Sequence, residues 1–68
     1  MANSEKLEEY RKNSGKSKTY LAKKLKISRP YFYRCLKNPD LFTFSQVEIL
    51  SKEMDIKSRK DKDDIFLP

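Results

Sequence analysis

The sequence contains no histidine, one cysteine and one glycine among its 68 residues. Without histidine the chain cannot form a Ser-His-Asp triad or a His/Cys metal cluster. The lone Cys35 cannot form a disulfide within the chain. A single free cysteine is typical of proteins in a reducing environment such as the cytosol. A single glycine and few alternating β-branched residues argue against a β-sheet. We therefore expect a helical protein that is not an enzyme and binds no metal or cofactor.

Long apolar runs are also absent. A chain of 68 residues forms at most one small domain, and its core is too small to enclose a substrate. No apolar run approaches the ~20 residues that a membrane-spanning helix needs, and residues 1–10 lack the apolar region of a secretory signal. Asp61, Asp63 and Asp64 have neither the spacing nor the turn glycine of a calcium loop, so we interpret them as solvated charge. We expect a cytoplasmic protein that does not contact the membrane.

Acidic residues are missing from the middle of the chain, where basic residues are abundant. Between Tyr10 and Pro39 there are ten lysines and arginines and no aspartate or glutamate. Residues 1–40 carry a net charge of +7, and residues 41–68 carry −1. A surface of one sign is typical of proteins that bind a polyanion. The asymmetry predicts a binding face in the first part and a supporting or partner-facing role for the second.

Helical periodicity accounts for almost every segment, so we predict an all-α domain of four to five helices spanning 1–68. The first three predicted helices span about 4–13, 18–25 and 29–37. Supporting helices are expected within about 43–67, the first of them ending near Met54 and a short one opening at Ser58.

Capping signals set these boundaries. Gly15 can adopt the left-handed conformation that ends a helix, and Ser17 and Ser28 are suitable N-caps. Pro30 falls in a first helical turn, where its missing N–H costs no hydrogen bond. The pattern Thr43-x-x-Gln46 predicts a capping box.

Apolar residues at helical spacing define the predicted core. They are Leu7, Tyr10, Leu21, Ala22, Leu25, Ile27, Phe32, Cys35, Leu36, Val47, Leu50 and Met54. The segment 65–67 has two possible roles: it closes this core, or it forms an exposed apolar patch that makes a dimer.

Residues 18–37 have the dimensions of a helix-turn-helix, in which two short helices are joined by a turn of about three residues. Ala22 is small enough for the second helix to cross the first closely. Arg29, Tyr33 and Lys37 align at helical spacing on the side opposite the apolar stripe. This pattern narrows the predicted polyanion to duplex DNA.

The run SKTYLAKKLKISRPYFYRCLKN resembles the helix-turn-helix of the phage repressor and Cro family. Its S-x-x-x-L-A-x-x-L pattern before the turn and I-S-R-x-x-F-x-R after it are that family's usual residues. NPDLFTFSQVEILSKEMDI is similar to the family's next helix, and DDIFLP to the C-terminal helix of small regulators from low-GC Gram-positive phages. Two residues depart from the pattern: Lys26 replaces a common turn glycine, and Lys18 replaces a common glutamine.

The resemblance implies a repressor-like domain that regulates transcription from a double-stranded DNA operator in the cytoplasm of a bacterial host, associated with the nucleoid when bound. It also implies a weak homodimer on half-sites ~34 Å apart. The DNA-contacting residues that it implies are Ser17, Lys18, Ser28, Arg29, Tyr33, Arg34, Lys37 and Asn38.

Two groups with different tasks are expected within this set. Ser28, Arg29 and Arg34 would face base edges in the major groove, which is where sequence is read; the alternative is that one arginine contacts only phosphate. Ser17, Lys18, Lys37 and Asn38 would contact the DNA backbone. Tyr33 would bond a base or a phosphate, or simply cover the edge of the core. Lys16 is a further candidate for the docking edge.

Two other functions fit parts of the sequence. One is a protein-interaction module on a helix-turn-helix fold, binding another regulator (an anti-repressor or co-repressor) through residues 41–68. The acid-free window argues against this as the sole role, because lysine is depleted at the cores of protein interfaces. The other is a cationic peptide that binds membranes or any nucleic acid, which would leave the apolar helix faces free rather than packed.

Overall fold

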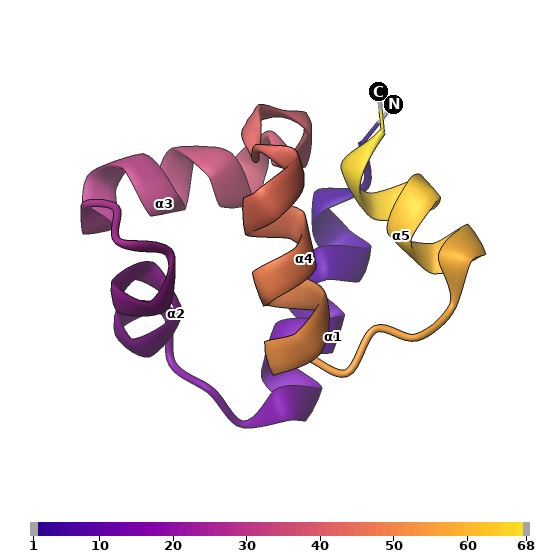
Figure 1. Cartoon of the computed structure of the whole chain (residues 1–68), viewed down its shortest axis with the longest axis horizontal. Coiled ribbons are helices and arrows are strands. Elements are labelled where there is room, and N and C mark those ends of the chain that lie inside the picture. The colour runs from indigo at the N-terminus through magenta and orange to yellow at the C-terminus, as the bar shows by residue number, and fades with distance from the viewer. Residues whose placement is uncertain (1, 68) are drawn as a thin grey trace.

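The computed structural model describes residues 2–67, and every regular element in that range is helical (Figure 1). The elements are α1 (Ser4–Ser14), α2 (Lys18–Leu25), α3 (Arg29–Lys37), the short 3-10 helix η1 (Pro39–Leu41), α4 (Phe44–Glu53) and α5 (Arg59–Phe66). The predicted all-α class is confirmed, and the bounds of α2 and α3 are those expected from the sequence. The sequence pattern does not predict η1, which continues the chain for one turn after α3 ends.

Local hydrogen bonds explain where the helices begin. The side-chain oxygens of Ser17, Ser28 and Ser58 each accept a bond from the backbone N–H three residues later. Thr43 and Gln46 form both bonds of the predicted capping box, so this prediction is confirmed. Asn3 caps α1 in the same way, which the sequence interpretation missed.

A residue in the left-handed conformation lies just after each of three helices, α1, α2 and α4. Gly15 has φ 72° after α1, as predicted. Lys26 has φ 59° at the end of α2, and the N–H of Ile27 then donates to the Ala22 carbonyl at 3.1 Å. A residue other than glycine costs about 1–2 kcal/mol in this conformation, so the backbone at Lys26 is strained. Asp55, with φ 56°, plays a similar part after α4.

Most of the predicted core is buried, and four positions lie only at its edge. Leu7, Leu21, Phe32 and Cys35 have no exposed surface. The partly buried residues, which were predicted to be core, are Tyr10, Ile27, Leu36 and Val47. Tyr10, Leu36 and Val47 lie on α1, α3 and α4, and Ile27 lies in the turn between α2 and α3.

Three aromatic rings connect the first part of the chain to the last. The Phe42 ring lies with its centroid 6.0 Å from that of Phe32 in α3 and 6.0 Å from that of Phe66 in α5. Tilted and edge-on pairs at this distance are favourable beyond the area they bury. Ile65 is fully buried and Phe66 is 6% exposed, whereas Leu67 is 56% exposed. The first two residues of this segment therefore close the core, and the third remains on the surface.

Polar contacts attach α5 to α1. Lys6 Nζ lies 2.9 Å from Asp61 Oδ1 and 3.3 Å from Asp64 Oδ2, and the Tyr10 hydroxyl donates to Asp61. Hydrogen bonds from Tyr10 and Lys6 lower the pKa of Asp61. The interpretation of Asp61 and Asp64 as merely solvated charge is therefore wrong, because the fold brings α1 within reach of both.

No helix within residues 2–67 is long and apolar enough to cross a membrane.

Candidate nucleic-acid interface

The α2–α3 pair forms one end of the molecule, and α3 runs along its outer edge (Figure 1). Three residues, 26–28, separate the two helices. Ala22 is 2% exposed, and Leu21 and Phe32 are fully buried. These apolar residues fix α2 against α3 and the core, so the opposite side of α3 faces outward.

The outward side of α3 brings together several of the predicted contact residues. A shallow concavity there is lined by Pro30, Tyr33, Arg34, Lys37 and Asn38. Tyr33 is 44% exposed, so part of its side chain is accessible to a ligand. Arg29 is exposed at the start of the helix, next to its cap Ser28. The predicted residues of α3 therefore share one accessible surface.

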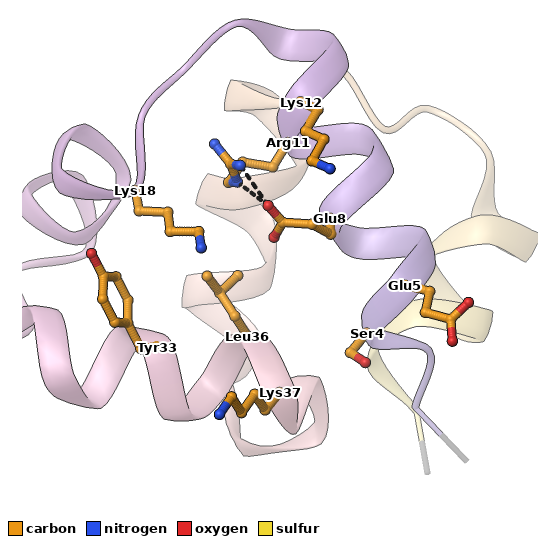
Figure 2. A pocket seen from close by; sticks show the side chains of 9 residues that line it. All are labelled: Ser4, Glu5, Glu8, Arg11, Lys12, Lys18, Tyr33, Leu36 and Lys37. Atoms are coloured by element: carbon orange, nitrogen blue, oxygen red, sulfur yellow. Dashed lines mark hydrogen bonds and ion pairs between the residues drawn. The ribbon is translucent and has the colours of Figure 1, made fainter.

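Lys18 joins this surface from the first turn of α2. Its Nζ lies 5.3 Å from the centroid of the Tyr33 ring, which is a cation–π distance. Figure 2 shows the Lys18 side chain extending between α1 and α3, beside Tyr33. Ser17 precedes it as the cap of α2, accepting from the Tyr20 N–H at 3.1 Å. The contact between Lys18 and Tyr33 was not predicted, because it depends on how the two helices cross.

A groove between α1 and α3 borders this surface (Figure 2). Its volume is about 570 Å³, and its lining includes Lys18, Tyr33 and Lys37 on one side and Glu8 and Lys12 on the other. Two carboxylates of α1, those of Glu5 and Glu8, also line this groove beside the basic residues.

An ion pair holds Glu8 in place. Its Oε1 accepts from Arg11 Nε at 2.7 Å, and Arg11 Nη1 donates to the Lys16 carbonyl at 3.1 Å. The hydrogen bond from Arg11 lowers the pKa of Glu8, and the charges of Lys18 and Lys12 act in the same direction. Arg11 thus fixes the loop before α2 rather than offering its charge to a ligand. The spacing of Glu8 and Arg11, three residues apart, is the sequence signal that points to this pair.

Lys16 is also engaged within the protein. Its Nζ donates to the Glu53 carbonyl at 2.7 Å and to Glu53 Oε1 at 2.9 Å. The bond from Lys16 lowers the pKa of Glu53. The Lys16 ammonium group therefore secures the end of α4, and its place at a docking edge stays a prediction.

The other cations of the α2–α3 region have no such partners. Within residues 2–67, none of them forms an ion pair; they are Lys18, Lys23, Lys24, Lys26, Arg29, Arg34 and Lys37. Because no acidic residue lies between positions 10 and 39, nothing nearby in the chain neutralises them. Their positive potential adds up over one end of the molecule, which favours anionic ligands.

The remaining reactive groups considered are the possible metal ligands and the thiol of Cys35. Across residues 2–67, no group of three or more His, Cys, Asp or Glu side chains is placed to hold a metal ion. Cys35 is buried, and burial raises the pKa of its thiol. A neutral buried thiol is a poor nucleophile, so Cys35 acts as a core residue.

No protein-family model, curated protein or solved structure matches the chain. The resemblance to the phage repressor and Cro family therefore depends on the residues of the chain itself, above all those of 17–38.

Proposed function

We propose that the protein is a sequence-specific, double-stranded DNA-binding transcriptional regulator of the Cro and repressor type. The observation that carries the proposal is the outward side of α3, where Arg34 and Lys37 lie without carboxylate partners in residues 2–67. Lys18 extends the same basic surface from the start of α2. Helix, exposure and charge therefore coincide on one edge.

The dimensions of α3 suit the major groove. An α-helix with its side chains is about 10–12 Å across, and the groove is about 12 Å wide, so α3 can lie in it with its exposed side toward the bases. Arg29 and Arg34 then read base edges, since an arginine bonds guanine through two acceptors. Lys37 and Asn38 hold the backbone at the far end of the helix.

The start of α2 supplies the second point of attachment. Its unpaired N–H groups and the Lys18 ammonium group face a backbone phosphate, and Ser17 and Ser28 still carry hydroxyl protons to donate. In this proposal Lys18 leaves the Tyr33 ring for the phosphate, or bridges the two. Two such contacts fix the register in which α3 reads the bases.

In this proposal the protein regulates transcription by occupying its DNA operator. A phage-like regulator of this size blocks or recruits polymerase by its position on the operator, and a weak homodimer would cover two half-sites ~34 Å apart. The proposal places the protein in the bacterial cytoplasm, on the nucleoid when bound.

Selection of bound duplexes from a random DNA pool tests the proposal. The selection is run at low and at near-physiological salt, with the double variant Arg29→Ala/Arg34→Ala as the matched control. Both arginines are exposed, so the control should keep the fold, which a circular dichroism melt verifies. We expect a motif that persists at the higher salt for the wild type and is lost in the control.

A different result would refute the proposal. Binding without enrichment, fading as salt rises, would leave only a cationic surface. In that case the alternative function, a protein-interaction module that binds another regulator, becomes the better explanation of these observations.

A further inference from the structure

The shallow concavity on the outward side of α3 has an apolar part as well as a basic part. Its volume is about 400 Å³, and it is lined by Pro30, Tyr33, Arg34, Lys37 and Asn38; we call it the α3 hollow. Pro30 lies three residues before Tyr33 and four before Arg34, so these side chains are neighbours on one side of the helix. The cations of the hollow have a task in the DNA binding proposed above, whereas Pro30 has none.

Pro30 is exposed but has no side-chain group that forms hydrogen bonds. Its side chain is a hydrocarbon ring, its nitrogen carries no hydrogen, and it lies in the first turn of α3. A polar base edge placed against this ring would lose water and gain no hydrogen bond, which is unfavourable. The ring therefore favours contact with an apolar group.

The Tyr33 ring is the second apolar wall. Tyr33 lines both the α3 hollow and the groove between α1 and α3, whereas Lys18 lines only that groove. The Lys18 ammonium group, 5.3 Å from the ring centroid, therefore lies on the groove side of the ring and leaves the other side to the hollow. Tyr33 is exposed, so a ligand can reach its ring.

The major groove of DNA offers a group that suits these walls. Thymine presents a 5-methyl group there, next to its O4 acceptor, whereas cytosine presents an N4–H donor and no methyl group. The hollow contains two cationic donors, Arg34 and Lys37, and no carboxylate to accept from such a donor. Its apolar walls and its polar groups therefore both favour thymine over cytosine.

We propose that Pro30 and Tyr33 receive a pyrimidine 5-methyl group, so that the recognised DNA carries a thymine beside the guanine that Arg34 reads. This inference rests on the proposed function, because it requires the α3 hollow to face base edges. A 5-methylcytosine presents the same methyl group but lacks the O4 acceptor, and so it replaces the thymine only in part. Cytosine methylation at this position then strengthens binding.

Anisotropy titrations with modified duplexes test the inference. Deoxyuridine replaces each thymine of the selected motif in turn, which removes one methyl group and keeps the base pair. At the position where affinity falls, a second pair of duplexes carries 5-methylcytosine or cytosine opposite guanine. We expect the methylated member of each pair to bind about fourfold more tightly, the effect of burying one methyl-sized group.

A protein variant connects this preference to the hollow. Pro30→Ser removes the apolar ring at an exposed position, so the fold should persist, which a circular dichroism melt verifies. This variant should bind the two members of each pair equally. Tyr31→Ser is the matched control, because Tyr31 is also exposed on α3 but does not line the hollow, and it should keep the preference for the methylated member.

The outcomes separate this inference from the proposed function. Equal binding of thymine and deoxyuridine duplexes at every position, or a full preference in Pro30→Ser, would overturn the methyl contact and leave the selected motif standing. A preference confined to the thymine pair supports thymine as the source of the methyl group, and a preference in both pairs adds 5-methylcytosine. A selection without any motif would refute the proposed function, and the methyl contact with it.

Discussion

Basic side chains serve different purposes at two edges of this molecule. Along the α1–α5 edge, Lys6 lies between Asp61 and Asp64, and its charge is used within the protein. Along the α2–α3 edge, Arg34 and Lys37 have no carboxylate partner within residues 2–67. The difference arises from what each neighbouring helix supplies: α5 brings two aspartates within ion-pair distance of Lys6, whereas no carboxylate of residues 2–67 lies that close to Arg34 or Lys37.

The basic residues of the two edges should therefore contribute to different properties, DNA binding at one edge and folding stability at the other. Exposed ion pairs contribute modestly to the folded state, whereas unpaired cations remain able to replace the counterions of a nucleic acid. Substitutions at the α2–α3 edge should therefore change DNA affinity, and substitutions at the α1–α5 edge should change the melting temperature.

The largest effect is expected at the residues that read bases. Arg29→Ala or Arg34→Ala should weaken binding to the selected duplex by about 10- to 100-fold, because a bidentate arginine–guanine pair discriminates by ~1–3 kcal/mol. Each variant should lose preference at a single base pair, which anisotropy titrations against single-base-pair variants of the duplex would reveal. Arg59→Ala in α5 is the control and should bind normally. A uniform loss across all duplexes would show that the arginine contacts only phosphate.

Lys37 should behave differently, because it holds the backbone. Lys37→Ala is expected to weaken all sequences about equally and to reduce the slope of log affinity against log salt by about one. Titrations at several salt concentrations measure this slope. Lys60→Ala, an exposed lysine of α5, should leave it unchanged. An altered base preference in Lys37→Ala would contradict the assigned role.

Glu8 is one of two carboxylates that line the groove with Lys18, and removing its charge should strengthen DNA binding rather than weaken it. Glu8→Gln is expected to tighten binding to every duplex by about threefold, because a negative charge no longer faces the phosphates near Lys18. It should also lower the melting temperature slightly, since Arg11 loses its charged partner. Glu9→Gln, which changes the charge at an exposed position outside the groove, is the control. Weaker binding would mean that Glu8 holds Lys18 in its productive position.

The α1–α5 edge should respond to acid. The Tyr10 and Lys6 bonds depress the pKa of Asp61 in the folded state, so their stabilising effect is full above its unfolded pKa of about 3.9. The effect is lost as pH falls through the lower folded pKa. Asp61→Asn should therefore melt a few degrees below the wild type at neutral pH, and the gap should close in acid.

Thermal melts by circular dichroism across this pH range measure the effect, with Asp63→Asn as the control. DNA affinity at neutral pH should be unchanged in Asp61→Asn. A gap that persists in acid would show that the carboxylate charge is not the cause.

The smallest effect concerns the turn between α2 and α3. Lys26→Gly should raise the free energy of unfolding by about 0.5 kcal/mol, because relief of left-handed strain exceeds the entropy that glycine loses. Asp55→Gly after α4 should gain less, since aspartate tolerates this conformation better. Urea unfolding of both variants measures these changes in the free energy of unfolding. A Lys26→Gly variant less stable than the wild type would contradict the prediction.

Local signals made much of the fold predictable. Ser17 and Ser28 mark the starts of α2 and α3 through bonds that span only three residues, and so their bounds agree with the sequence prediction. Contacts between distant residues were not predictable in this way. The bond of Lys16 to Glu53 depends on the arrangement of several helices, and nothing near Lys16 in the sequence indicates it.

The same limit applies to the candidate interface. Helical spacing places Tyr33, Arg34 and Lys37 on the outward side of α3, and the structure has them there. The position of Lys18 over Tyr33 and the carboxylate of Glu8 across the groove depend on helix crossing, which no local pattern fixes. That these residues bind DNA stays a prediction.

The most direct test of this account is a map of backbone amide shifts by nuclear magnetic resonance, as a selected duplex is added to the labelled protein. We expect the largest changes at residues 17–38, concentrated at the start of α2 and along α3, with α5 almost unaffected. Changes centred on α4 and α5, or none at any duplex concentration, would contradict the claim that the unpaired cations of the α2–α3 edge form the binding surface.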